Sequence, residues 1–375
     1  MSEKIRVALV GGAGMWGRYY LKAMAENPRC EIIGFVDRSV ERRRAFAEHH
    51  GIPPEREFDD LAEVFEREVP AAVAAILPVQ HTVDTVLACV EAGVKAVTVE
   101  KPFAVQLSRA DAAVDACRAA GVALGCGTAY WEVPFLQETA AWVGEGHIGA
   151  LTGAAIPGGL PREVSGAGCV QLTMLRLLSG MEVEWVEGWT LPPEPGWVLP
   201  EGAEEHELDC PAYGRLGLSG GIVCEIPPPS GEGEVPCRVS LKGAGGQLWA
   251  QGPQSVLIKG VGAASTPVWP DFLRQERPPR SMSSVVDRLL DAVESGASEV
   301  ACSGHDYRQA LEIALALKLS AREGNRRVHL PLEDRSGRIF PHPYRLRGGD
   351  VAGYESIGYE GPPKVEGRVK LDKGE

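Results

Sequence analysis

The sequence predicts an α/β protein with two domains. The first is a Rossmann domain built on a doubly wound parallel sheet, and the second is an α+β domain with an open, mainly antiparallel sheet. From residue 5 to about residue 125, short β-branched runs alternate with amphipathic helical stretches, as in a parallel sheet covered on both faces. After Gly125 this alternation stops, and longer strand-like runs rich in Gly and Pro follow. We therefore expect domains over residues 1–125 and 126–331 and an extended arm over 332–375.

Each element of the first domain follows from its local pattern. β-branched, apolar runs predict strands at Ile5–Val10, Glu31–Val36, Ala72–Leu77, Lys95–Val99 and Val122–Gly125. Amphipathic spacing predicts helices at Trp16–Glu26, Val40–His49, Leu61–Glu68, Val83–Ala92 and Ser108–Ala119. Ser108 is the expected N-cap of the last of these helices, because Asp111 follows at the capping-box position.

The second domain has strand-like runs at Ile222–Ile226, Val235–Lys242 and Gln247–Gln251. Two late helices, Ser281–Ser295 and Asp306–Glu323, are expected to pack on this domain. Within the arm, residues 335–344 are too apolar for a solvated tail. We therefore expect them to pack on the second domain or on a neighbouring subunit.

Composition excludes several classes of function. The net charge of -13 disfavours nucleic acids and anionic membrane surfaces as partners, and no run approaches the roughly 20 apolar residues of a membrane span. No signal peptide precedes Ile5, so the protein is expected to be cytoplasmic. The nine cysteines are scattered without metal-ligand spacing, so we expect reduced thiols and no metal.

A dinucleotide fingerprint follows the first strand. The run Gly12-Ala13-Gly14-Met15-Trp16-Gly17 matches G-x-G-x-x-G, which lets backbone N–H groups approach a pyrophosphate at a helix N-terminus. Asp37 ends the second strand, at the distance from which a carboxylate reaches the adenosine ribose and repels a 2′-phosphate. NAD is therefore the expected cofactor, with NADP left open because Arg38 offers a partner for that phosphate. The alternatives are a glycine-rich turn that binds nothing and an Asp37 that only caps the next helix.

Two further motifs carry a family resemblance. Pro78-Val79-Gln80-His81 follows the Ala72–Leu77 strand, and Glu100-Lys101-Pro102 follows Lys95–Val99. Together with the glycine turn, these two motifs make the chain resemble the Gfo/Idh/MocA family. The similarity continues through residues 144–149 and 310–331. The resemblance implies a second domain with a large open sheet whose outer face often mediates homo-oligomers. It also implies NAD(P)-dependent chemistry on a small sugar, inositol or polyol derivative, with Pro102 shaping its turn, for which a cis bond is open.

Lys101 is the main catalytic candidate. A lysine at the carboxyl end of a parallel strand faces the ligand crevice, where it can polarise a carbonyl or pass a proton during hydride transfer. The alternative is a surface salt bridge with Glu100. His81 is a second candidate, for a role in the proton relay. Alternatively it could contact the cofactor ribose, cap the next helix or be an ordinary loop histidine. The expected cofactor-binding set is Gly12, Ala13, Gly14, Met15, Trp16, Gly17, Asp37, Arg38, Pro78, His81, Glu100 and Lys101.

The second domain departs from the family pattern. Relatives carry D-x-G-x-H, and aligning that motif on Gly168 places Gly166 at the Asp position and Val170 at the His position. In place of that pair, Lys101 could act alone or with His81, Tyr130 or Cys169. A histidine from another segment could also enter, such as His147, His206 or His305. Gln171 and Thr173 could hydrogen-bond substrate hydroxyls, or they simply belong to a helix N-terminus.

Aromatic residues replace the Asn/Arg-rich stretch usual in relatives. Tyr130 and Trp131 would suit stacking on a sugar face or packing between domains.

Three functions follow from these observations. The first is an NAD(P)-dependent oxidoreductase acting on CH–OH groups, with Lys101 as the main acid/base. The second is a dinucleotide-binding sensor or assembly subunit with little dehydrogenase activity. The third is a redox-neutral enzyme, catalysing epimerisation, elimination or glycoside cleavage, that recycles bound NAD.

Overall fold

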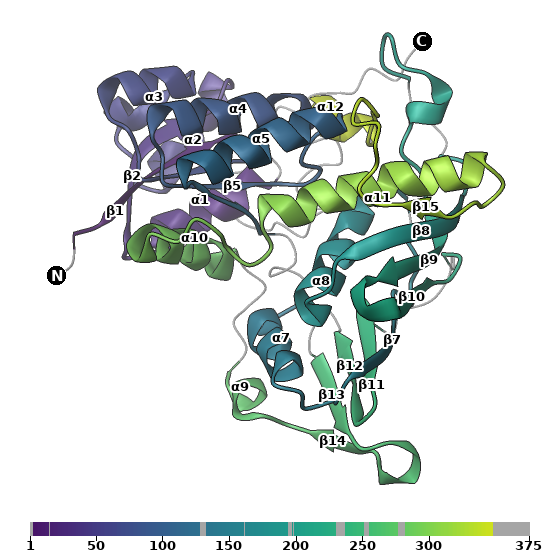
Figure 1. Ribbon diagram of the computed structural model, residues 1–375. Coiled ribbons are helices and arrows are strands. Elements are labelled where there is room, and N and C mark those ends of the chain that lie inside the picture. Colours follow the sequence, from purple (N-terminus) through teal and green to yellow (C-terminus); the bar gives the residue numbers. More distant parts are fainter. Residues whose placement is uncertain are drawn as a thin grey trace.

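The computed structural model has two domains joined along a shared face (Figure 1). It describes residues 3–347, apart from Met15, residues 128–132, Pro161, residues 194–196, Val198 and residues 230–236, 251–254 and 277–281. Among the residues described, no helix combines the length and the apolar character that crossing a bilayer requires.

The first domain is built on a six-stranded, all-parallel sheet with the order β3-β2-β1-β4-β5-β6. Its strands are β1 (Ile5–Val10), β2 (Cys30–Val36), β3 (Glu57–Phe58), β4 (Ala72–Ala75), β5 (Ala96–Val99) and β6 (Ala123–Cys126). β4, β5 and β6 are buried along their whole length, as expected for strands covered by helices on both faces. The predicted doubly wound sheet is confirmed, and only the two-residue β3 was missed, because so short a strand leaves no periodic pattern.

Helices cover both faces of this sheet (Figure 1). They are α1 (Gly17–Glu26), α2 (Val40–His49), α3 (Leu61–Arg67), α4 (Val79–Ala92) and α5 (Leu107–Ala120). The predicted N-cap of α5 is wrong: the helix begins at Leu107, and the amide of Ser108 donates to the carbonyl of Arg335 at 2.8 Å. The C-terminal arm, rather than a local side chain, therefore satisfies the free amides of this helix start.

The second domain contains a nine-stranded sheet with the order β14-β13-β12-β11-β7-β10-β9-β8-β15. Every neighbouring pair is antiparallel except β10 and β7. The strands are β7 (Leu151–Ala155), β8 (Val183–Thr190), β9 (Ala212–Leu218), β10 (Ile222–Ile226), β11 (Val239–Gly243), β12 (Gly246–Ala250), β13 (Ser255–Lys259), β14 (Thr266–Val268) and β15 (Val328–His329). The predicted open, mainly antiparallel sheet is thus confirmed.

One face of this sheet is covered and the other carries exposed aromatic side chains. Helices α7 (Leu136–Gly144) and α8 (Cys169–Ser179) lie on the covered face, and the short α9 (Asp271–Arg274) follows β14 (Figure 1). On the opposite face Trp189 and Trp249 are 44% and 40% exposed. Alternating burial along β11 and β12 shows that the sheet separates a packed side from a solvent side.

The two late helices do not both pack as predicted. α10 (Ser283–Ser295) returns to the first domain, where it contacts α1 and β4, β5 and β6. α11 (Gly304–Arg322) runs between the domains and contacts α5 and β6 on one side and α8 and β8 on the other (Figure 1). The sequence could not assign these partners, because an amphipathic face specifies burial but not what buries it.

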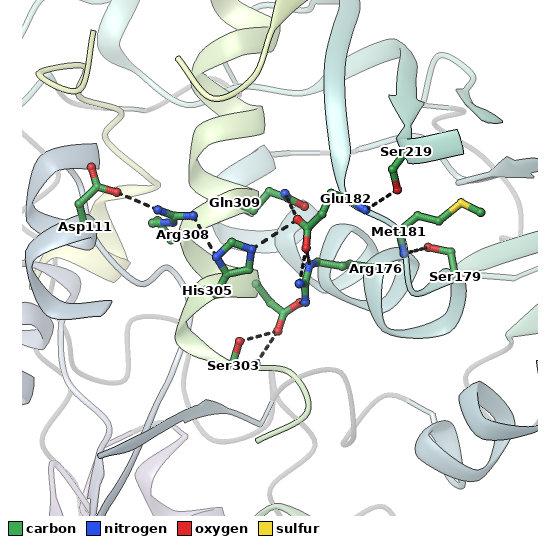
Figure 2. Close-up of polar contacts among 11 residues, drawn as sticks. Asp111, Arg176, Ser179, Met181, Glu182, Ser219, Ser303, His305, Arg308 and Gln309 are labelled. Atoms are coloured by element: carbon green, nitrogen blue, oxygen red, sulfur yellow. Dashed lines mark hydrogen bonds and ion pairs between the residues drawn. The ribbon is translucent and has the colours of Figure 1, made fainter. Parts of the chain in front are cut away.

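A chain of polar contacts along α11 ties the domains together (Figure 2). Arg308 donates to Asp111 of α5 at 3.3 Å and to Nδ1 of His305 at 2.9 Å. Nε2 of His305 then faces Glu182 at 3.4 Å, and Glu182 also accepts from Nε of Arg176 at 2.9 Å. These bonds hold the pKa of Glu182 down at about 2 despite its partial burial. Charged and hydrogen-bonded side chains therefore add specificity to the apolar packing of α11 between the domains.

The arm packs on both domains. The amide of Leu107 donates to the carbonyl of Gly337 at 3.1 Å, and the amide of Phe340 donates to the carbonyl of Glu207 at 2.7 Å. Ile339 between them is fully buried. The expectation of packing on the second domain is thus met for the described residues 332–347, and the first domain is an additional contact. The arm ends in a short helix, α12 (Pro343–Arg347), and residues 348–375 lie outside the described part.

Candidate functional site

A cavity of about 700 Å³ lies at the carboxyl end of the parallel sheet. It is lined by the glycine turn, the end of β2, the start of α4, the segment after β5 and one side chain from the C-terminal arm. Among its lining residues are Gly14, Trp16, Gly17, Asp37, Arg38, Pro78, His81, Glu100, Lys101 and Arg345. Ligands of doubly wound sheets bind at this edge. The fold thus brings together most of the residues that the sequence singled out.

The glycine turn leaves its backbone accessible to a ligand. A Cβ on Gly17 would lie 2.0 Å from the carbonyl oxygen of Gly11, so no larger residue fits between the turn and α1. Among the described residues, a Cβ on Gly14 would meet only that same oxygen, at 3.1 Å, and Gly14 itself lines the cavity. Within the described residues no side chain caps the N-terminus of α1. The turn therefore offers the space and the helix end that a pyrophosphate requires.

Asp37 is fixed beside the glycine turn by two backbone amides. Its Oδ2 accepts from the amide of Ala13 at 3.1 Å, and its Oδ1 accepts from the amide of Ser39 at 2.9 Å. The N-cap of α2 is Ser39 and not Asp37. The carboxylate thus links the glycine turn to the end of β2, in the position where a ribose would meet it. Met15, also predicted to bind the cofactor, lies outside the described residues.

Lys101 pairs with Glu100, which is itself held by Tyr20. Its side chain is 10% exposed, and Nζ lies 3.7 Å from Oε2 of Glu100. Oε1 of Glu100 accepts from the hydroxyl of Tyr20 at 2.8 Å. Burial and the adjacent Glu100 raise the pKa of Tyr20 well above its usual value, so the phenol stays a neutral donor. The Lys101–Pro102 bond is cis. The alternative of a surface salt bridge with Glu100 is wrong about the location: the ion pair is present but buried in the cavity, where it does not exclude a catalytic role.

His81 enters the same cavity from the first turn of α4. Its amide donates to the carbonyl of Pro78 at 2.9 Å, and its own carbonyl accepts from the hydroxyl of Thr85. These backbone bonds fix the position of the ring-bearing residue at the start of the helix. His81 and Lys101 thus line one space from two neighbouring strand ends, as the sequence motifs predicted.

The second domain presents a different group from the one relatives carry. Gly166 and Gly168 lie in a π-helical turn, η2 (Val164–Gly168), and Val170 is buried at the start of α8. The space beside Gly166 is filled by Glu163, which pairs with Arg345 of α12. Arg345 also donates from Nη1 to the carbonyl oxygen of Lys101 at 3.4 Å. An arginine from the arm therefore stands at the cavity wall nearest the lysine.

A buried aspartate, Asp209, holds the η2 turn in place through hydrogen bonds. Asp209 accepts from the amides of Val164 and Ser165, at 2.9 Å and 2.7 Å, and from the Ser165 hydroxyl at 2.6 Å. Burial and the neighbouring Glu163 nevertheless raise its pKa to about 6. Asp209 thus fixes the turn that carries Gly166. The negative charge of Glu163 affects Asp209 electrostatically, by raising its pKa.

The three polar candidates on α8 are turned into the protein. Burial raises the pKa of the Cys169 thiol to about 12, against the influence of Lys101 and Arg345, so it is not a reactive thiolate. The Thr173 hydroxyl donates to the carbonyl of Cys169 at 2.8 Å, and Gln171 is 5% exposed. None of these three is among the described residues that line the cavity. Tyr130 and Trp131, also predicted to contact substrate, lie outside the described part of the chain.

The histidines considered as replacements have other partners. His147 stacks on Trp142, and His206 lies 3.0 Å from Glu204. His305 belongs to the polar chain of Figure 2. None of these three histidines is among the described residues that line the cavity.

Sequence reasoning missed Arg345, Glu163 and Tyr20. Arg345 lies 244 residues from Lys101 along the chain, so no local spacing connects them. The apolar character of residues 335–344 was the only available signal, since it indicated that the arm packs on something. Tyr20 follows the glycine turn by less than one helical turn, but nothing in its spacing indicates a partner on β5.

Residues 5–128 match a family described as an oxidoreductase family with an NAD-binding Rossmann fold, Gfo/Idh/MocA. A D-apiose dehydrogenase from Paraburkholderia graminis is 31% identical over 147 residues, which make up 39% of this chain and 38% of that protein. The match thus spans well under half of this curated relative.

Solved structures resemble nearly the whole chain. An aldose-aldose oxidoreductase from Caulobacter crescentus, complexed with glycerol, has a TM-score of 0.69 at 19% identity and covers 88% of this chain and 100% of its own. An inositol dehydrogenase homolog from Azotobacter vinelandii, complexed with NAD⁺, has a TM-score of 0.71 at 17% identity and covers 88% of this chain and 98% of its own. At such identities the likeness concerns the fold of both domains.

Proposed function

We propose that the chain is an NAD-dependent oxidoreductase of the Gfo/Idh/MocA family, because residues 5–128 match that family and its NAD-binding Rossmann fold. The reaction is hydride transfer between the nicotinamide and a CH–OH or carbonyl group of a sugar, inositol or related polyol. One observation carries the proposal: Lys101 lies in the same cavity as the glycine turn and Asp37. A proton-handling group thus shares one space with the elements that bind a dinucleotide.

The residues present fit NAD. The turn around Gly14 and the N-terminus of α1 would hold the pyrophosphate, and Asp37 would bind the adenosine ribose. When bound, NAD supplies a nicotinamide ring that accepts or donates a hydride. The carboxylate of Asp37 disfavours a 2′-phosphate through like charge, which supports NAD over NADP even though Arg38 lines the same cavity.

Lys101 would handle the proton that accompanies the hydride. In reduction its ammonium polarises the substrate carbonyl and donates a proton to the oxygen. In oxidation the neutral amine takes the hydroxyl proton as the C–H bond breaks. Glu100, fixed by Tyr20, holds the side chain in place during both. His81 lines the same space and would accept or relay that proton.

The proposed substrate class is supported by similar proteins and by the side chains that line the cavity. The similar proteins named above include a D-apiose dehydrogenase and an aldose-aldose oxidoreductase. In this chain the amine of Lys101 and the guanidinium of Arg345 line the cavity. Both donate hydrogen bonds to oxygen lone pairs, which polyols carry in abundance.

The test compares Lys101→Ala with Lys95→Ala, because Lys95 is exposed just before the same strand, β5. Each protein is mixed with NAD⁺ and with D-glucose, D-apiose, myo-inositol or glycerol, and NADH formation is followed at 340 nm. We expect Lys101→Ala to lose roughly 100-fold or more in kcat, the scale of general acid–base catalysis. Lys95→Ala should match the wild type.

The alternatives give other results. A wild type that binds NADH but turns over no substrate, with Lys101→Ala binding NADH equally well, indicates a sensor or assembly subunit. Product formation without net NADH release indicates the redox-neutral enzyme. Either outcome would falsify the oxidoreductase proposal.

Cellular setting and assembly follow as parts of the same proposal. All nine cysteines are free and buried, which suits the reducing cytoplasm. The exposed tryptophans on the outer sheet face, Trp189 and Trp249, support a homo-oligomer formed through that face. Mass photometry of the wild type and of Trp249→Glu tests this, because a charge in that face should shift the assembly toward monomer.

A further inference from the structure

The cavity wall beside Lys101 contains a pair that no motif predicted. A Cβ built on Gly166 would lie 2.2 Å from Oε1 of Glu163 and 2.6 Å from Nε of Arg345. The Glu163 carboxylate and the Arg345 guanidinium therefore occupy the space in which a side chain at position 166 would stand. A residue other than glycine at 166 would displace this pair.

The pair is buried and well satisfied. The side chains of Glu163 and Arg345 are 3% and 9% exposed. Glu163 accepts from Nε of Arg345 through Oε1 and from the amide of His342 at 2.7 Å through Oε2. Burying two charges is costly, and such a pair adds little stability over well-packed apolar side chains. Its presence beside the cavity is thus better explained by what the guanidinium contacts than by folding.

Only one member of the pair reaches the cavity. Arg345 lines it together with Lys101, and its Nη1 donates to the carbonyl oxygen of that lysine. Glu163 is not among the described lining residues. Arg345 is therefore the member of the pair that a ligand in this cavity would meet, and Glu163 lies behind it.

We infer that Arg345 donates hydrogen bonds to substrate oxygens next to the reacting carbon, and that Glu163 is the positioning residue that holds its guanidinium there. The inference rests on the proposed function and deepens it. A planar guanidinium matches two adjacent acceptor oxygens, which belong to a vicinal diol or to a carboxylate. The substrate is therefore a polyol or a sugar acid that presents such an oxygen pair beside its reactive carbon.

The C-terminal arm is then part of the active site. Two other arginines anchor it: Arg338 bonds Glu207 at 2.8 Å and 2.9 Å, and Arg335 bonds Asp111 at 2.8 Å and 2.6 Å. Arg338 borders a different cavity from the one that holds Lys101. It offers a matched control, because its loss removes one of several contacts of the arm and leaves the proposed site untouched.

The experiment compares Arg345→Ala, Arg345→Lys and Glu163→Gln with Arg338→Ala. Probes are D-glucose and myo-inositol as diols and D-gluconate and D-glucuronate as acids. KM and kcat are measured where NADH forms, and probe binding to the NADH complex is measured by saturation-transfer NMR. NADH affinity is measured by fluorescence and folding by thermal unfolding.

We expect Arg345→Ala to weaken binding of the preferred probe, or raise its KM, at least about tenfold, as for loss of a charge-assisted hydrogen bond. Its NADH affinity should stay within about twofold, because the cofactor contacts lie elsewhere. Arg345→Lys should recover part of the loss and Glu163→Gln should fall between the two. Arg338→Ala should resemble the wild type. A tenfold effect confined to the acids assigns a carboxylate, and one shared with the neutral sugars assigns a diol.

Four results overturn the inference. Equal effects of Arg345→Ala and Arg338→Ala indicate arm docking alone, and a parallel loss of NADH affinity indicates a cofactor contact. An absence of probe binding to the wild-type NADH complex removes the substrate role altogether. The proposed function is judged separately by Lys101→Ala, so an active enzyme with an indifferent Arg345 refutes only the present inference.

Discussion

The ammonium group of Lys101 lies 5.0 Å from the centre of the Trp16 ring. Trp16 belongs to the glycine turn and Lys101 follows β5, so two motifs from different parts of the chain meet inside one cavity. The contact is a cation–π interaction, which is worth about 0.5–2 kcal/mol depending on its exposure to water. Together with Glu100 it sets the position of the proposed proton donor relative to the cofactor turn.

Replacing Trp16 should therefore affect catalysis through the orientation of Lys101. Trp16→Phe keeps an aromatic face, and we expect it to retain most of kcat/KM. Trp16→Leu removes the face and should lower kcat/KM by roughly threefold to tenfold. Steady-state kinetics at saturating NAD⁺ provide the comparison. Equal activities of the Phe and Leu variants would show that the ring has no electrostatic role.

The two glycines of the turn should respond differently to alanine. Gly14→Ala meets only the oxygen of Gly11 at 3.1 Å, so the fold should be nearly unchanged while the new methyl group blocks the pyrophosphate. We expect its NADH affinity to fall about tenfold or more with little change in melting temperature. A Gly14→Ala protein that binds NADH normally would place the pyrophosphate elsewhere.

Gly17→Ala serves as the structural counterpart. Its Cβ would lie 2.0 Å from a backbone oxygen, so the chain must shift. We expect a loss of about 1–3 kcal/mol in the free energy of unfolding, measured by urea denaturation. If Gly17→Ala is as stable as the wild type, then the turn is not packed as tightly as described.

The buried Asp209 should make stability depend on pH. Its pKa rises from 3.8 to about 6 on folding, because of burial and the nearby Glu163. Between these values the folded state binds more protons, so this group's contribution to stability is fully present below pH 3.8 and is lost as the pH rises through 6.

Asp209→Asn tests that contribution. The variant should be less stable than the wild type at every pH, because an amide nitrogen would face some of the donors that Asp209 accepts from. Its deficit should nonetheless shrink by about 1 kcal/mol between pH 5 and pH 7.5. Urea unfolding at both pH values gives the two differences. A deficit that is constant with pH contradicts the raised pKa.

Removing the arm should destabilise both domains. In a chain ending at residue 333, the 4%-exposed side chain of Glu312 and the partly buried Asp111 lose Arg335, and the buried Ile339 is gone. We expect a loss of about 3–5 kcal/mol, the scale of breaking a buried ion pair, and lower solubility. Calorimetry of the truncated and full-length chains measures it. An unchanged melting temperature and a stable assembly would show that the arm is dispensable.

Much of the first domain could be read from sequence. The strand Ile5–Val10 and the helix ends at Glu26, His49 and Ala92 agree between prediction and structure. They were predictable because local periodicity, turn glycines and β-branched runs act within a few residues. The start of α5 was not, because its free amides bond to the arm, which is more than 200 residues away in the chain.

The sequence by itself determined the fold class, the glycine turn with its terminal Asp37, and the lysine that follows β5. It also revealed that Gly166 and Val170 occupy the places of an expected acid and histidine. Only the tertiary structure decided what fills that gap, since Glu163 and Arg345 meet beside Gly166 when the arm folds back across both domains. The physical reason is that such a contact depends on long-range packing of charged side chains, which leaves no periodic signature in the segments that contribute them.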